Sequence, residues 1–234
     1  MSEIINVHFY DDQNYNFENI PNNVIKYKNI QFIVKKHKIR DYSENAYESK
    51  IREMYRKYSE NITNKKLIPY MDTFMIDDIY NNNITFDYRS AIQDKELLFL
   101  SDPSIEKCIV CFDMDRTLHQ SSWILSMNKT CKEYIEYLST LLNTSIAYDD
   151  IGELLLGGKD RLIKMRKMFQ NLNKTIGMKN VYIITLNDHK YLSVFLSELY
   201  SKLFNIRFSK TNIIYTKKTK LDDIKNIVYK YSTH

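Results

Sequence analysis

The chain has 234 residues and a net charge of +5, and its 44% hydrophobic and 27% charged residues are typical of a globular protein. It has no apolar run of roughly 18 residues and no signal-peptide pattern, so we expect a protein of the cytoplasm or nucleus without membrane contact. Three cysteines are too few for a disulfide framework, and the small positive charge permits an acidic or phosphorylated partner without requiring one.

The first region, residues 1–103, has an irregular pattern that predicts an N-terminal α+β extension. Extended segments are predicted at Glu3–Tyr10, Val24–Lys35 and Asn83–Tyr88. The apolar side chains of Glu44–Tyr58 recur at helical spacing, so we expect a helix there. A turn at Ser101–Ser104 predicts the boundary with a second region, residues 104–234.

The second region alternates strands and helices. Strands are predicted at Cys108–Phe112, Val181–Thr185 and Ile206–Tyr215. Helices are predicted at Thr130–Leu142, Lys159–Leu172, Asp188–Phe204 and Leu221–Tyr231. This order predicts an α/β, Rossmann-like fold with a parallel sheet flanked by helices. Sites in such folds lie at the carboxyl ends of the strands, so the residues that follow each strand are the candidates for function.

Two carboxylates, Asp113 and Asp115, follow the first of these strands. One carboxylate can attack phosphorus to form an aspartyl phosphate, and the other can donate a proton to the leaving oxygen. Two like charges so close together are unfavourable unless a cation lies between them. The pair therefore predicts Mg²⁺ as the cofactor, with Asp113 and Asp115 as its ligands.

The segment Ile109–Thr117 resembles the first motif of the haloacid dehalogenase (HAD) superfamily, an apolar strand followed by D-x-D-x-T. The D-x-D-x-T-L form is similar to the branch of the carboxy-terminal-domain protein phosphatases, although Arg116 stands where that branch usually carries Glu. The resemblance implies a phosphatase in which Asp113 is the nucleophile and Asp115 the general acid and base. The alternative is a strand that merely ends in an acidic turn.

The second family motif is an apolar strand that ends in Thr or Ser, and Val181–Thr185 resembles it. The helix that follows offers free N–H groups to an anion. Thr185 and Thr117 are thus the phosphate-binding residues that the resemblance implies. The alternative is a buried strand whose last hydroxyl only makes a structural hydrogen bond.

The third family motif is a lysine at the start of the next helix, where its charge offsets those of the nucleophile and the phosphoryl oxygens. Lys217, Lys218 and Lys220 are the candidates, and Lys218 is preferred because apolar residues follow it as they follow the family lysine. The fourth motif, a strand that ends in acidic residues, is missing after the last helix. Thr73–Asp78 has the right local form but lies upstream, where its use would require a permuted sheet.

The segment Leu118–Gly158 leaves room for one helix and a flap, so we expect no large cap over the site. An open site suits a macromolecular substrate such as a phosphoprotein. The basic run within Lys159–Lys167 favours a solvated face, and no nucleic-acid motif accompanies it.

A capless HAD domain behind a long N-terminal region also resembles the 38K nucleocapsid-assembly protein family of baculoviruses and nudiviruses. That resemblance implies a capsid or DNA-packaging partner, and a location in the host nucleus or virion. Two functions remain open at this point. One is a Mg²⁺-dependent phosphatase, and the other is a catalytically decayed HAD-fold interaction protein, which the missing fourth motif favours.

Overall fold

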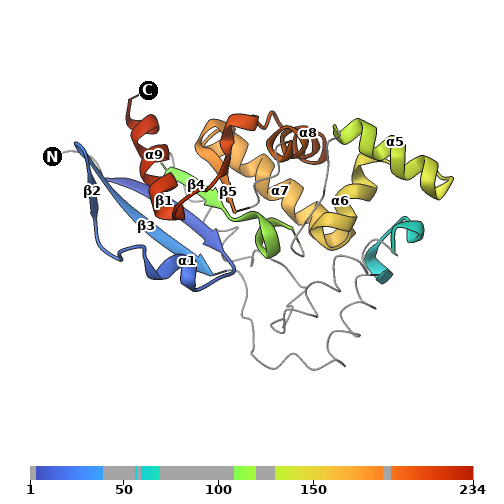
Figure 1. Ribbon diagram of the computed structural model, residues 1–234, viewed down its shortest axis with the longest axis horizontal. Coiled ribbons are helices and arrows are strands. Elements are labelled where there is room, and N and C mark those ends of the chain that lie inside the picture. Colours follow the sequence, from blue (N-terminus) through green and yellow to red (C-terminus); the bar gives the residue numbers. More distant parts are fainter. Residues whose placement is uncertain are drawn as a thin grey trace.

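The computed structural model describes residues 4–38, 56, 59–68, 108–119, 130–186 and 191–233. The strands in these ranges form one six-stranded sheet in the order β2-β3-β1-β4-β5-β6 (Figure 1). They are β1 (Ile5–Asp11), β2 (Ile25–Tyr27), β3 (Ile30–Lys38), β4 (Cys108–Phe112), β5 (Val181–Thr185) and β6 (Ile213–Tyr215). Each neighbouring pair is parallel except β2 and β3, which are antiparallel. The predicted α/β class with a mostly parallel sheet is confirmed.

Helices cover both faces of the sheet. They are α1 (Tyr15–Glu18), α5 (Cys131–Leu142), α6 (Tyr148–Leu156), α7 (Lys159–Thr175), α8 (Leu192–Phe204) and α9 (Lys220–Ser232). Val110 and Phe112 of β4 pack in a core with α5 to α8, whereas Ile109 and Cys111 pack in a second core with α9. Because side chains alternate across a strand, an unbroken apolar strand fills both cores, and β4 is buried along its whole length.

The strands of the N-terminal region belong to the same sheet as β4. β1 is hydrogen-bonded to β3 on one side and to β4 on the other, with Val7 opposite Ile109 and Phe9 opposite Cys111. Val7 and Phe9 are both fully buried. The predicted boundary at residue 103 lies outside the described residues, but the strands on either side of it are direct neighbours.

Several element boundaries differ from the prediction for local reasons. Val24–Lys35 is not one strand, because Lys28 has a φ of 54° and turns the chain between β2 and β3. The strand expected from Ile206 begins only at Ile213, after a 3-10 turn at Lys210–Asn212. The helix in front of it ends at Asn205, which has a φ of 51°.

Other predicted elements cannot be compared. Asn83–Tyr88, Ser101–Ser104 and the first residues of Asp188–Phe204 lie outside the described residues, as does Glu44–Tyr58 apart from Arg56. The strands predicted at Cys108–Phe112 and Val181–Thr185 are confirmed at both ends. Among the helices in the described ranges, none is both long enough and apolar enough to cross a membrane.

Candidate functional site

Three neighbouring parallel strands end at the same edge of the sheet, and each ends in polar residues. Asp11 is the last residue of β1, Asp113 follows β4, and Thr185 is the last residue of β5. The backbone N–H of Asp113 donates to the carbonyl of Tyr10 over 2.8 Å, which fixes the ends of β1 and β4 side by side. The end of β4 thus lies between two other polar strand ends, as expected for a site in a parallel sheet.

The carboxylates of Asp11, Asp12 and Asp113 form a buried acidic cluster. Each offers an oxygen atom that lies within 4.8 Å of the oxygens of the other two, and their exposed fractions are 0%, 2% and 7%. Buried charges of one sign are costly unless opposite charges accompany them. This group of oxygen ligands could hold a metal ion, because hard divalent cations prefer carboxylate oxygens.

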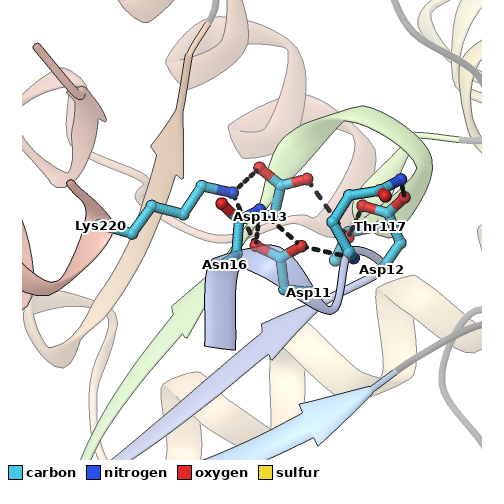
Figure 2. Close-up of polar contacts among 7 residues, drawn as sticks. Asp11, Asp12, Asn16, Asp113, Thr117 and Lys220 are labelled. Carbon is cyan, nitrogen blue, oxygen red and sulfur yellow. Dashed lines mark hydrogen bonds and ion pairs between the residues drawn. The ribbon is translucent and has the colours of Figure 1, made fainter. Parts of the chain in front are cut away.

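Lys220 brings a positive charge to this cluster (Figure 2). Its Nζ atom lies 2.6 Å from a carboxylate oxygen of Asp11 and 2.6 Å from one of Asp113. Lys220 is the first residue of α9, and the hydroxyl of Thr219 caps that helix by accepting from the N–H of Asp222. The Lys220 side chain is buried, and its ammonium group forms ion pairs with both carboxylates.

The three charged groups shift one another's pKa values. Burial raises the pKa of Asp113 well above its ordinary value; Lys220 opposes the rise, while Asp11, Asp12 and Asp115 add to it. Burial likewise raises the pKa of Asp11, against the effect of Lys220. Burial alone would lower the pKa of Lys220, but Asp113 and Asp11 outweigh it, so this pKa is raised. Three carboxylates thus share one ammonium group, and burial outweighs the effect of that group on the pKa values of Asp11 and Asp113.

Neighbouring side chains fix the directions of the carboxylates (Figure 2). The amide of Asn16 donates to both oxygens of Asp11 over 3.0 and 2.9 Å. The backbone N–H of Gln13 also donates to Asp11, over 2.8 Å, and its side-chain amide donates to Asp12. The hydroxyl of Thr117 lies 3.4 Å from an oxygen of Asp12 and 3.4 Å from one of Asp113. These contacts hold the oxygens in place before any ligand arrives.

The chain leaves Asp113 in a single wide turn, Met114–Leu118, in which the N–H of His119 donates to the carbonyl of Met114 over 2.9 Å. Arg161 of α7 supports this turn from behind. Its guanidinium donates to the carbonyl of Thr117 over 2.7 Å and to that of Leu156 over 2.5 Å. The wide turn bends the backbone within five residues, so Asp115 and Thr117 stay close to Asp113.

A cavity of about 320 Å³ opens at the acidic cluster. Its lining includes the polar residues Asp12, Asp113, Asp115 and Lys220, together with Tyr15 and Leu186. Asp115 is half-buried, so its carboxylate is accessible from the cavity. The volume is enough for a phosphate group and part of the group esterified to it, since ligand cavities of this order hold small molecules.

The structure brings most of the predicted site residues together. Asp113, Asp115 and Thr117 lie around the cavity or in contact with its lining. Thr185 is buried at the end of β5, and the next residue lines the cavity. Lys218 is the exception: it is exposed, as is Lys217, and the third candidate, Lys220, makes the contacts with the carboxylates.

Sequence reasoning missed Asp11 and Asp12. The signal was present, because the segment Ile5–Asp11 is a strand with fully buried apolar residues that runs directly into two aspartates. This is the local form of the fourth motif described above, but it precedes the first motif in the chain. The upstream segment considered in its place, Thr73–Asp78, lies outside the described residues.

We found no family model, no curated protein and no solved structure that matches this chain. The geometry of the site is therefore the basis for assigning its chemistry.

Proposed function

We propose that this protein is a Mg²⁺-dependent phosphatase that works through an aspartyl phosphate on Asp113. The observation that carries the proposal is the position of Lys220 between Asp11 and Asp113, in the lining of a cavity that Asp115 also lines. A nucleophilic carboxylate, a second carboxylate for proton transfer and a buried ammonium group are the parts that phosphoryl transfer to Asp requires.

We further propose that the domain has a HAD fold whose fourth motif comes from the start of the chain. What matters in a parallel sheet is which strand ends are neighbours, and not the order of the strands along the sequence. β1 ends in two aspartates and lies directly beside β4, whose last residue precedes Asp113. β5 lies on the other side of β4 and ends in Thr185. These neighbours support a permuted arrangement in which Asp11 and Asp12 do the work of the family's acidic strand.

The ligand set fits Mg²⁺. Asp12 and Asp113 would hold the cation, with Asp11 beside them as a third buried carboxylate. Mg²⁺ is commonly held by one or two carboxylates and keeps several waters, and this cluster satisfies that need. When bound, the cation would offset the charge of the phosphoryl oxygens and of the cluster itself.

The side chains can then divide the reaction between them. A carboxylate oxygen of Asp113 attacks phosphorus, the bond from phosphorus to the ester oxygen breaks, and Asp115 gives its proton to that oxygen. In the second half, Asp115 takes a proton from water, whose oxygen attacks phosphorus and releases phosphate from Asp113. Lys220 holds one oxygen of Asp113, which directs the other for attack, and the hydroxyls of Thr117 and Thr185 are phosphate ligands in this proposal.

The acidic cluster favours this enzyme over the decayed interaction protein. The hypothesis of an interaction protein is favoured by the lack of an acidic fourth motif in the predicted second region. Asp11 and Asp12 supply carboxylates of the kind that this motif would provide. A phosphoprotein is the substrate class we propose, because the described part of the cavity is open enough to admit a protruding side chain. A capsid or DNA-packaging partner stays a prediction that no described residue tests.

The decisive experiment compares wild type with Asp113→Asn, which keeps the shape of the side chain and removes its nucleophilic charge. We expect hydrolysis of an aryl phosphate to require Mg²⁺ and to fall by about 1,000-fold or more in the variant. Asp160→Asn, at an exposed position of α7, is the matched control and should leave the rate unchanged. Equal rates in wild type and Asp113→Asn would rule out the aspartyl-phosphate mechanism. A lack of both turnover and any Mg²⁺ effect on thermal melting would favour the interaction protein.

A further inference from the structure

Two apolar side chains, Tyr15 and Leu186, line the cavity that contains Asp113 and Lys220. Tyr15 begins α1, just after the end of β1, and Leu186 follows the end of β5. Since β1 and β5 flank β4, the two side chains come from opposite sides of the strand that carries Asp113. The two side chains thus reach the same cavity from α1 and from the segment after β5.

The exposure of these side chains sets them apart from the rest of the site. Tyr15 is 53% exposed and Leu186 is 55% exposed, whereas Asp113 is only 7% exposed. The site therefore has a buried polar part and an accessible apolar part. A ligand that reaches Asp113 with a charged group would contact Tyr15 and Leu186 with the part that stays outside.

The charges that line the cavity also indicate which part of a phosphate ester would supply its binding energy. Three carboxylates line the cavity, those of Asp12, Asp113 and Asp115, and Asp11 lies beside them. Among the described lining residues, the one basic side chain is that of Lys220. Even with a divalent cation bound, this site offers a phosphate dianion little net attraction, because carboxylates and phosphate repel each other. Binding energy from the non-reacting part of the substrate must make up the difference.

We infer that Tyr15 and Leu186 bind the ring of an aryl phosphate, so that the substrates are aryl phosphomonoesters such as phosphotyrosine side chains. This inference rests on the proposed phosphatase function. In phosphotyrosine the flat apolar ring separates the phosphate from the peptide backbone, and an aromatic ring packs well against another ring and an aliphatic side chain. In phosphoserine, the polar peptide backbone would lie in that place and gain nothing from the apolar contact.

Binding of two non-hydrolysable phosphonates in the presence of Mg²⁺ tests the inference without depending on turnover. Phenylphosphonate carries the ring and methylphosphonate lacks it, and calorimetry gives the dissociation constant of each. We expect wild type to bind phenylphosphonate about tenfold more tightly, and Tyr15→Ala and Leu186→Ala each to reduce that preference by about three- to fivefold. Tyr137→Ala, at a 48% exposed tyrosine on α5, is the control and should keep the full preference.

The outcomes separate the two proposals. A preference for phenylphosphonate that both variants weaken supports the aryl site. Equal affinities for the two phosphonates in wild type, or a preference that Tyr15→Ala and Leu186→Ala leave intact, overturns the aryl site while the phosphatase stands. If neither phosphonate binds and wild type hydrolyses no aryl phosphate, both proposals fail. In hydrolysis assays, the loss of kcat/KM in Tyr15→Ala should be larger for a phosphotyrosine peptide than for a phosphoserine peptide of the same sequence.

Discussion

The ammonium group of Lys220 lies 2.6 Å from the carboxylate of Asp11, a residue 209 positions away in the sequence. The same nitrogen lies 2.6 Å from Asp113, so this lysine at the start of α9 joins the end of β1 to the residue that follows β4. Removal of this ammonium group would leave two buried carboxylates without their cationic partner, and this makes Lys220 central to stability.

Lys220→Met should therefore destabilise the metal-free protein by about 3 kcal/mol, because it leaves two buried carboxylates uncompensated. The matched control is Lys218→Met, two residues away, where the side chain is exposed and the expected change is below about 0.5 kcal/mol. Urea unfolding of the two variants measures both effects. Equal losses of stability would contradict the assignment of Lys220 as the buried partner.

Asp12→Asn removes one charge from the acidic cluster and keeps the size of the side chain. Without metal, we expect the variant to be more stable than wild type by about 1 kcal/mol, or roughly 2–4 °C in Tm, because repulsion among the carboxylates falls. With Mg²⁺, wild type should gain stability through binding, and the variant should gain much less. Thermal melts with and without Mg²⁺ measure this.

Asp160→Asn is the control for Asp12→Asn and should respond to Mg²⁺ as wild type does. A wild-type melting temperature that is insensitive to Mg²⁺ at millimolar concentration would count against a metal site at Asp12. An Asp12→Asn protein with an unchanged Mg²⁺ response would show that the cation binds elsewhere.

The buried histidines should lower the stability of the protein at mildly acidic pH, because they stay neutral in the folded state. Burial, with a further contribution from Arg161, lowers the pKa of His119 from 6.5 to about 3. The unfolded chain then binds the proton first as the pH falls, so stability is complete above about pH 6.5 and is lost progressively towards pH 3. The loss from His119 between pH 7 and pH 5 should be about 2 kcal/mol.

His8 and His37 add to this effect, since burial lowers their pKa values to about 3 and about 4. Urea unfolding at pH 7 and pH 5 measures the total. In His119→Gln, the difference in stability between the two pH values should shrink by about 2 kcal/mol. An identical pH dependence in wild type and His119→Gln would show that His119 titrates normally in the folded protein.

Arg161→Met should destabilise the protein by about 2–4 kcal/mol, because the carbonyls of Thr117 and Leu156 lose their donors in a buried place. The variant should also slow hydrolysis, since the turn that carries Asp115 loses its support. Lys167→Met, at an exposed position of the same helix, is the control for both measurements. A stable and fully active Arg161→Met protein would contradict the supporting role.

The local part of the fold could be predicted from the sequence. Cys108–Phe112 and Val181–Thr185 were identified because continuous apolar runs of this length suit buried parallel strands. The helix at Thr130–Leu142 was also predicted, and Thr130 caps it as the sequence T-x-x-E suggests. In each case the deciding information lies within a dozen residues.

The order of strands in the sheet could not be predicted, because local patterns do not say which strands are neighbours. For this reason the strand in front of Asp11 and Asp12 was recognised as extended, but its aspartates were not connected to Asp113. A local signal favours Lys220 over Lys218. Thr219 followed by Asp222 predicts a helix that starts at Lys220, and a lysine at a helix start reaches the strand ends.

The central place of β1 in the sheet also has a consequence for folding. β1 is synthesised before β4, yet one of its edges pairs with β4, which follows about a hundred residues later. Until β4 exists, the N–H and C=O groups of that edge lack their partners in β4. They lie beside apolar side chains that the folded protein buries, such as Val7 and Phe9. The newly made N-terminal strands are therefore open to pairing with other chains, and the rate at which β4 docks sets how long this exposure lasts.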